Sequence, residues 1–206
     1  VYDAYEKGFE KYNVEYADFV TADEMSDETI KELENDNKVR IYDQRYYKLK
    51  ESKRNATIRV YGERKEVNKL CIMSGRLAKA DDEITLDRVF AKNNDYKVGD
   101  NIKIGDKDYK ITGFVAMPDY SCLFEDNADM MFDSVNFGVA SMTDSCIKKL
   151  KKSKLNYCYA MRYNKKPKSD KEQKNMSDDF LKSLAKKAAV TSYIPRCENK
   201  AINFTG

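Results

Sequence analysis

Histidine is absent from all 206 residues of the chain. Without an imidazole, neither a Ser-His-Asp triad nor a Cys-His pair can form, and most zinc chemistry loses its commonest ligand. An enzyme made from this sequence would depend on carboxylates, lysines, tyrosines or cysteines, and this is the least favoured class of function. We therefore expect no enzymatic activity, no catalytic residue, no metal and no cofactor.

Motifs for phosphate and metal binding are missing as well. Residues 74–76 (Ser-Gly-Arg) and 98–100 (Val-Gly-Asp) lack the paired glycines and the Lys-Ser/Thr of phosphate loops. The five cysteines include no C-x-x-C pair, which argues against a zinc site or a disulfide scaffold, although one or two disulfides remain open. The acidic segment 125–133 lacks the glycine and the regular oxygen spacing of an EF-hand, so a surface loop is the better interpretation.

Long apolar runs are also lacking. No stretch approaches the ~20 residues that a membrane-spanning helix needs, and the charged, aromatic segment from Val1 to Glu10 lacks the apolar core of a signal peptide. The chain begins with Val1 rather than Met. We therefore expect an excised or processed piece of a longer protein, whose flanking membrane segments would lie outside this sequence.

Charge of either sign is not in excess. The net charge is +3, from 38 basic and 35 acidic residues, which argues against a dedicated nucleic-acid binder because such a protein gathers basic residues on one face. Five lysines between 148 and 154 form the densest basic run. An anionic partner is one interpretation, but a solvated helix face is the more common explanation.

The first 62 residues predict the order strand, helix, strand, strand. They follow a short amphipathic helix, in which aromatic residues recur at helical spacing from Tyr2 to Tyr12. Residues 14–21 alternate as a strand, Ser26 begins a helix, a single strand opens at residue 39 and extends through residue 49, and residues 56–60 return after a polar turn.

Residues 74–115 predict a small strand–helix–hairpin module. Leu86, Val89 and Phe90 fall on one helical face, with Asp87 as the N-cap. Residues 102–104 and 109–111 alternate on either side of a Gly-Asp turn, which indicates a hairpin. The module looks like an insertion into something larger.

The second half predicts β-α-β-α-β. We expect strands at 135–139, 155–163 and 190–194, a helix capped by Thr143 or Asp144, a helix beginning at Ser177, and a mobile lysine-rich loop at 164–175. Two βαβ units on either side of an inserted module favour an α+β fold, ferredoxin-like and layered, with strands from both ends of the chain in one sheet.

The order of short motifs resembles the extracytoplasmic domain of FtsX-like (MacB-like) ABC transporter permeases. These motifs are Gly-Arg at 75–76, Asp-Glu-Ile-x-Leu at 82–86, Val-Phe-Ala-Lys at 89–92, Lys-Val-Gly-Asp at 97–100 and Tyr-Lys-Ile-x-Gly-Phe at 109–114. Tyr-Ile-Pro-Arg at 193–196 and Ala-Ile-Asn-Phe at 201–204 are similar to members from Gram-positive bacteria. The motif-bearing part covers about a fifth of the chain.

This resemblance implies a split architecture. Residues 1–67 and 130–206 would form a porter-like subdomain, and residues 68–129 an inserted, mainly β, Sabre-like subdomain. The domain would lie at the extracellular face of the cytoplasmic membrane and transmit motion driven by a cytoplasmic ATPase to an extracellular protein, peptide or lipid. The full transporter would be a dimer and the isolated domain a monomer.

One segment stands out as a candidate contact surface for a partner. Residues 116–134 show no clear period, yet they are too apolar for simple disorder. The candidate contact residues are Tyr120, Leu123, Phe124, Met130, Met131 and Phe132. Exposed apolar patches mark contact surfaces, although packing between subdomains explains the same residues equally well. A free-standing secreted binding or adhesion module, which needs no membrane neighbours, is the alternative function.

Overall fold

The computed structural model describes residues 2–203, with side chains from residue 7 onward. The predicted apolar face of the first helix at Tyr2 and Tyr5 therefore lies outside the described side chains. The fold is mixed α+β, as predicted, and the chain divides into two compact units. Within the described residues, no helix combines the length and the apolarity that crossing a bilayer requires.

The first unit, called the barrel unit here, contains residues 2–14, 46–155 and 200–203 of the described chain. Its strands are β3 (Tyr46–Lys50), β4 (Thr57–Tyr61), β5 (Cys71–Gly75), β6 (Glu83–Asp87), β7 (Asn101–Ile104), β8 (Lys107–Ala116) and β9 (Phe137–Ser141). Its helices are α1 (Tyr2–Lys11), α3 (Arg88–Asn93), α4 (Asp144–Lys148) and α6 (Lys200–Asn203), with the short 3-10 helices η1 (Pro118–Tyr120) and η2 (Lys152–Lys154).

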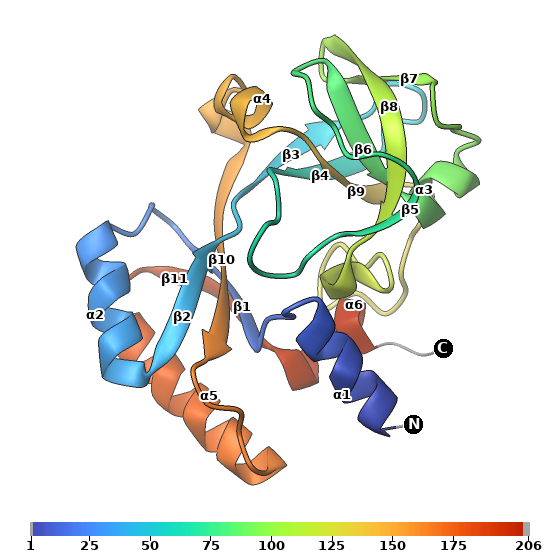
Figure 1. Ribbon diagram of the computed structural model, residues 1–206. Coiled ribbons are helices and arrows are strands. Elements are labelled where there is room, and N and C mark those ends of the chain that lie inside the picture. The colour runs from blue at the N-terminus through green and yellow to red at the C-terminus, as the bar shows by residue number, and fades with distance from the viewer. Residues whose placement is uncertain (1, 204–206) are drawn as a thin grey trace. The chain divides into compact units, whose positions relative to one another are not determined.

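Six strands of this unit close into a ring through their pairings; Figure 1 shows these strands together at the upper right. Neighbours pair in the order β3, β4, β9, β6, β8 and β7. The ring closes where Glu51, just after β3, bridges Ile104 at the end of β7. Ser52 N donates to Lys103 O at 3.0 Å, and Gly105 N donates to Lys50 O at 2.9 Å. Closure removes the sheet edges of these six strands, and the interior is filled by isoleucine and leucine side chains that are almost fully buried.

The predicted strand–helix–hairpin module is confirmed as β6, α3, β7 and β8. Asp87 accepts hydrogen bonds from Val89 N and Phe90 N, both at 3.0 Å, and so caps α3. Gly105, in the turn between β7 and β8, has the positive φ of 62° that glycine tolerates. The module also holds β5, a strand that the sequence did not predict because its side chains do not alternate between buried and exposed positions.

The cap of α3 makes stability depend on pH. Burial raises the pKa of Asp87 to about 6, and the hydrogen bonds from Phe90 N and Val89 N only partly oppose this. Because the folded pKa lies above the unfolded value of about 4, the contribution to stability is fully present below pH 4 and is lost as pH rises through 6. The unfolding free energy falls as pH rises because the folded state holds the proton more tightly than the unfolded state.

We expect wild type, measured against the Asp87→Asn variant, to lose about 2–3 kcal/mol of unfolding free energy between pH 4 and pH 7. Asparagine retains an oxygen that can accept the capping hydrogen bonds but has no charge to desolvate. Urea denaturation of both proteins at a series of pH values measures the difference. A difference between the two proteins that stays constant with pH would contradict the assignment to Asp87.

The second unit, called the layered unit here, contains residues 15–45 and 156–199. Its elements are β1 (Ala17–Thr21), α2 (Asp27–Asn37), β2 (Val39–Asp43), β10 (Leu155–Tyr163), α5 (Asp170–Ala185), β11 (Val190–Pro195) and the 3-10 helix η3 (Arg196–Glu198). The strands lie in the order β11, β1, β10, β2, and every neighbouring pair is antiparallel. Strands from both ends of the chain therefore share one sheet, as predicted.

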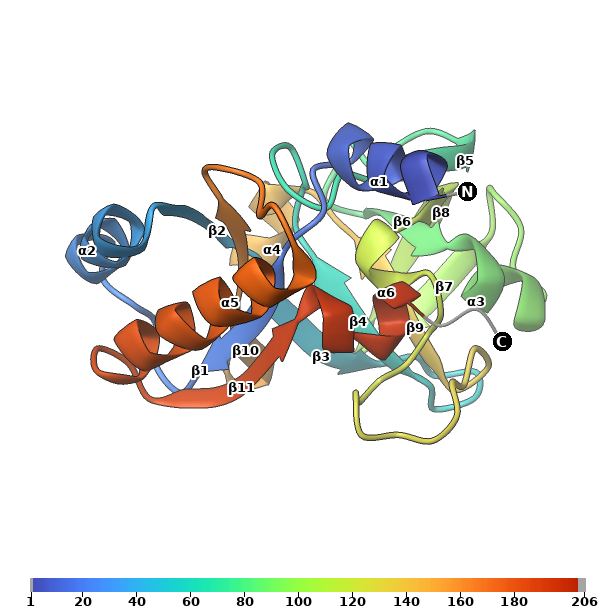
Figure 2. The same ribbon diagram turned by 90° about the horizontal axis from the view of Figure 1, so that it is seen from below.

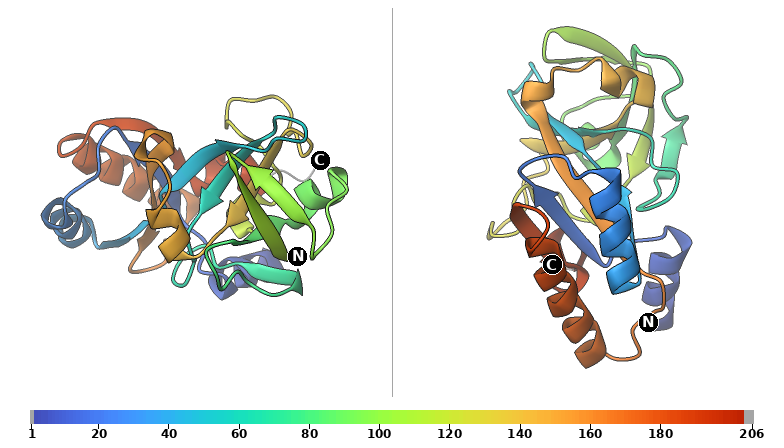
Figure 3. Two further views of the ribbon diagram at one scale, coloured as in Figure 1. Left: turned by 90° about the horizontal axis from the view of Figure 1, so that it is seen from above. Right: turned by 90° about the vertical axis from the view of Figure 1, so that its left-hand side faces the viewer.

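One face of this sheet packs against α2 and α5 (Figure 3). Leu33 of α2 and Phe180 and Leu184 of α5 are buried against the strands. Phe19 of β1 stacks on Tyr159 of β10, with ring centroids 5.3 Å apart. Burying such aromatic side chains removes a large apolar area from water, which is the main favourable term in forming this layer.

Two local predictions are wrong in their boundaries. Helix α5 begins at Asp170, within the predicted mobile loop, because Ser169 accepts from Glu172 N at 3.1 Å while the Glu172 carboxylate accepts from Lys168 N at 2.7 Å. The stretch 39–49 is two strands, and the division between the two units falls between them, after Arg45.

The units differ in extent from the predicted subdomains. Residues 46–67 and 130–155, predicted to belong to the porter-like part, lie in the barrel unit. No disulfide joins any of the five cysteines, all of which are among the described residues. The assignment of residues 1–67 with 130–206 as porter-like, and of 68–129 as Sabre-like, stays a prediction.

Candidate functional site

The six predicted contact residues separate into a buried group and an exposed group. Tyr120, Leu123 and Phe124 are buried and belong to the core of the barrel unit, which is the structural explanation that the sequence left open for them. Met130 and Met131 are 92% and 78% exposed, and Phe132 is 42% exposed. The exposed residues form the tip of the segment 120–134, called the tip loop here, which lies beside α6 in Figure 2.

A buried ion pair holds the beginning of the tip loop. The guanidinium of Arg64 donates to both carboxylate oxygens of Asp119, at 2.5 and 2.9 Å. The two side chains are only 3% and 5% exposed, and Arg64 also lies 4.3 Å from the ring centroid of Tyr61. Burial alone would lower the pKa of Arg64, but the Asp119 carboxylate outweighs burial and raises it. A bidentate pair of this kind fixes both position and orientation, so η1 is held against β4.

A second arginine holds the next residues of the loop. Arg59 of β4 lies between the rings of Tyr46 and Phe137, at 4.8 and 5.2 Å from their centroids. It donates to the hydroxyl of Tyr120 at 3.0 Å and to the carbonyl of Glu125 at 2.5 Å. Cation–π contacts and charge-assisted hydrogen bonds are both strengthened by burial. The loop is therefore attached to β4 on both sides of its buried aromatic residues.

The C-terminal helix α6 holds the far side of the tip loop. Cys122 N donates to Ala201 O at 3.0 Å. Lys200 donates through its backbone N–H to Asn127 Oδ1 and through its ammonium to Asp129 O, both at 2.8 Å. These contacts reach the residue before Met130, so the exposed methionines project from a backbone that is fixed directly next to them.

Two acidic residues of the tip loop close turns in or next to the loop, and a third, Glu125, lies 3.4 Å from the ammonium of Lys48 in β3. Asp126 accepts from Ala128 N at 2.9 Å, and Asp133 accepts from Asn136 N at 2.9 Å. The hydrogen bond from Asn136 lowers the pKa of Asp133. Side chains that close turns in this way explain an acidic loop without a bound ion. Among residues 2–203, no group of three carboxylates or thiols is arranged to hold a metal.

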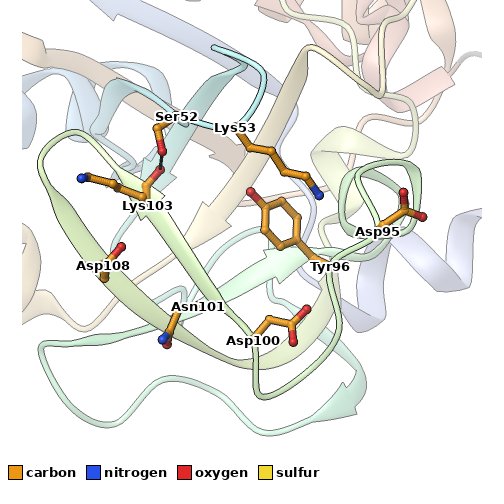
Figure 4. Close-up of a pocket in the computed structure, with 8 residues that line it drawn as sticks. All are labelled: Ser52, Lys53, Asp95, Tyr96, Asp100, Asn101, Lys103 and Asp108. Carbon is orange, nitrogen blue, oxygen red and sulfur yellow. Dashed lines mark hydrogen bonds between the residues drawn. The ribbon is translucent and has the colours of Figure 1, made fainter.

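A separate polar pocket of about 530 Å³ opens at one end of the barrel (Figure 4). Eight residues line it, namely Ser52, Lys53, Asp95, Tyr96, Asp100, Asn101, Lys103 and Asp108. Lys53 lies 5.0 Å from the ring centroid of Tyr96 and donates to Asn94 O at 2.9 Å. Tyr96 also packs on Phe90 and donates to Glu51 at 2.9 Å. The pocket offers charges of both signs, but its aromatic ring is already engaged by the protein.

Sequence reasoning missed the two arginines that position the tip loop. In a strand with apolar residues at 56, 58 and 60, alternation alone places Arg59 on the face opposite to them. In the structure both faces of β4 are covered, and Arg59 is enclosed by aromatic residues. Arg64 lies in the charged stretch from Glu63 to Lys69, which carries no signal of burial. In the basic run at 148–154, Lys149 is 68% exposed and pairs with Asp81 on the surface, which agrees with the interpretation of this run as a solvated helix face.

Similarity to known proteins is found among solved structures. No family model matches, and no curated protein matches. Among solved structures, the periplasmic region of MacB from Actinobacillus actinomycetemcomitans is similar, with a TM-score of 0.47, 13% identity, and 92% of this chain and 93% of that chain covered.

Two further structures are similar. The extracellular domain of the noncanonic ABC-type transporter YknZ from Gram-positive bacteria has a TM-score of 0.45 and 12% identity, covering 85% of this chain and 97% of that one. A putative lipoprotein from Bacillus anthracis has a TM-score of 0.42 and 10% identity, covering 86% and 96%.

Proposed function

We propose that this chain is the non-catalytic extracytoplasmic domain of an FtsX/MacB-like ABC transporter permease. In this proposal a cytoplasmic ATPase hydrolyses ATP, the membrane helices of the parent protein relay the motion, and the domain passes it to a substrate or partner outside the cell. The support from sequence is the ordered series of motifs between residues 74 and 115. These motifs fold together into the predicted strand–helix–hairpin module within one unit.

The placement of the terminal helices is compatible with this role. Helices α1 and α6 both belong to the barrel unit, and Figures 1 and 2 show them at the same end of that unit. A domain that hangs between two membrane helices needs both of its connections on one side. Motion of the two connections would then reach the barrel unit directly, and through α6 it would reach the tip loop.

We assign the layered unit as the ferredoxin-like, porter-like subdomain. The order β11, β1, β10, β2, with one helix after β1 and one after β10, supports this assignment because it consists of two βαβ units with their strands interleaved in one antiparallel sheet. The barrel unit then contains the inserted Sabre-like part. The insertion would lie between β2 and β10, which makes it longer than the predicted 68–129.

The tip of the tip loop is the proposed contact with the partner. The observation that supports this role is the exposure of Met130 and Met131. Methionine side chains are flexible and polarizable, and they suit interfaces that must adapt to a partner. Covering an almost fully exposed apolar side chain with a partner removes apolar area from water, which contributes favourably to the free energy of binding. Because the flanking residues are fixed by Arg59, Arg64 and Lys200, a force on the tip would pass into the barrel unit.

Purification of the complete gene product tests the function. We expect an ATPase subunit to co-purify with the parent protein from membranes, in a complex that contains two copies of the permease. A parent protein that is secreted, carries no apolar segments on either side of this chain and brings no ATPase would contradict the proposal. That result would favour the free-standing binding or adhesion module instead.

Replacing both exposed methionines tests the contact role. We expect the Met130→Ser/Met131→Ser variant to unfold within about 0.5 kcal/mol of wild type, because exposed side chains contribute little to stability. A photo-reactive residue at position 132 of the full-length protein in intact cells should give one discrete adduct, and its yield should fall about tenfold in the variant.

A photo-reactive residue at Lys110, an exposed position of β8, is the matched control. It should give no adduct that depends on the methionines. If position 132 gives no discrete adduct, or if the adduct forms equally well in the methionine variant, the tip is not the contact surface.

A further inference from the structure

A second pocket has a volume of about 350 Å³. Its walls are mainly apolar, in contrast to those of the polar pocket in Figure 4. The apolar wall is made by Cys71, Val89, Ala116, Met117, Pro118 and Tyr120. This volume is within the range of small ligand pockets, roughly 300–1,000 Å³. The pocket is part of the barrel unit and includes Tyr120 and Ser121, at the start of the tip loop, but not the exposed Met130, Met131 or Phe132.

Large apolar side chains are exposed around this pocket. Ile72 and Met73 of β5 are 50% and 42% exposed, and Val89 at the start of α3 is 39% exposed. Single exposed apolar residues are common on protein surfaces, but a group next to an apolar pocket is typical of a contact site. An apolar side chain from a partner could enter the pocket beside Val89, which lines it, and Met73, whose sulfur lies 3.8 Å from Cys71 Sγ.

The form of β5 shows which groups this surface offers. Strand β5 pairs with β8 alone among the described strands, and its register shifts between Ile72 and Ser74. Beyond the shift, Gly75 and Gly113 cross so closely that a Cβ on Gly113 would lie 2.4 Å from Arg76 O. A short edge strand with a bulge is a poor template for adding another strand. Side chains, rather than the backbone edge, are therefore the recognition groups here.

The charges around the pocket select the occupant. Arg88 lines the pocket. Lys11 lies beside the pocket, with its ammonium 5.3 Å from the ring centroid of the lining residue Tyr12. Arg88 and Lys11 face a single carboxylate among the lining residues, Asp87, which is buried under its capping hydrogen bonds.

This excess of positive charge disfavours a second copy of the chain, because two copies meeting through this face would bring like charges together. It favours a partner with carboxylates next to its apolar anchor. We propose that the pocket between β5, α3 and η1 binds an extended acidic peptide segment of a partner protein, with one large apolar side chain inserted and flanking Asp or Glu residues facing Arg88 and Lys11.

Selection from a random peptide library tests this proposal. The whole chain is immobilised, random twelve-residue peptides displayed on phage are selected on it, and the selected sequences are compared with those from the Val89→Asp variant. We expect peptides with one Leu, Phe or Met beside two or more acidic residues to be enriched on wild type alone. The best peptide, made synthetically, should bind about tenfold more weakly to Val89→Asp and to Arg88→Glu.

Three measurements control for loss of folding, for binding at the exposed methionines and for the contribution of charge. Val89 and Arg88 are exposed, so both variants should retain the wild-type thermal midpoint within a few degrees. The Met130→Ser/Met131→Ser variant should bind the peptide as wild type does, which separates this pocket from the tip loop. Added salt should weaken binding to wild type more than binding to Arg88→Glu.

Several results would overturn the proposal. Enrichment of basic or uncharged peptides would refute the acidic occupant, and equal enrichment on Val89→Asp would refute the site. No enrichment over bare beads would also refute it. Self-association of wild type in sedimentation, lost in Val89→Asp, would show that a second copy covers this face instead.

Discussion

Replacing Arg64 with Met is expected to lower the free energy of unfolding by about 3–5 kcal/mol, since it leaves the Asp119 carboxylate buried without its partner. Both side chains are at most 5% exposed, so water cannot replace the lost hydrogen bonds. The variant also loses the contact between the guanidinium and the Tyr61 ring. Urea denaturation followed by circular dichroism measures the change.

The matched control is the exposed pair of Lys174 and Asp178, whose side chains are 75% and 55% exposed. Lys174→Ala should cost at most about 0.5 kcal/mol, the value typical of a solvent-exposed helical pair. The double variant Arg64→Met/Asp119→Leu should recover much of the lost stability, because replacing both buried charges by apolar groups is often nearly neutral. If Arg64→Met costs no more than Lys174→Ala, the buried pair does not hold the tip loop as described.

Replacing Phe90 with Ala is expected to cost about 3–5 kcal/mol, because the ring of Phe90 is fully buried between α3 and the barrel and its loss leaves a cavity. The site is shaped for this ring. A Cβ added at Gly138 of β9 would lie 2.5 Å from Phe90 Cγ, closer than two carbons can approach. Gly138→Ala should therefore cost about 1–3 kcal/mol through overpacking.

The two substitutions act on the same space, so their effects should not add. In the double variant Phe90→Ala/Gly138→Ala the new methyl group fills part of the cavity and has no ring to strike, and the total cost should be at least about 1 kcal/mol less than the sum. Thermal and urea denaturation of the four proteins complete the cycle. Strict additivity would mean that Gly138 is not required by the ring of Phe90.

Local chemistry in the sequence predicted many of the elements. Ser26 accepts from Thr29 N and Asp87 from Val89 N, as the N-cap preference of short polar side chains requires. The alternating apolar residues of β10 were recognised from period alone. Where the prediction of an element is wrong, a local signal is present: Ser169 caps helix α5 by accepting from Glu172 N, and the Glu172 carboxylate accepts from Lys168 N, within a stretch whose lysines predict a loop.

The candidate sites could not be predicted in the same way. Tyr120 and Met131 lie in one apolar segment and look alike in sequence, yet one is buried and the other is 78% exposed. The difference depends on Arg59 and on α6, which are distant in the chain from the segment that they hold. The pocket beside β5 likewise requires residues from α3, β8 and η1 to meet. Periodicity cannot report contacts between segments so far apart.

The sequence by itself determined the α+β class, the helix caps, the hairpin turn and the absence of histidine chemistry, because each depends on residues within a few positions of one another or on composition. Only the tertiary structure decided that six strands close into a ring, that Arg64 and Asp119 are buried together, and that the methionines at 130 and 131 remain outside. The physical reason is that burial belongs to a position in three dimensions. It is set when distant segments pack, and it decides whether an apolar side chain stabilises the fold or remains available to a partner.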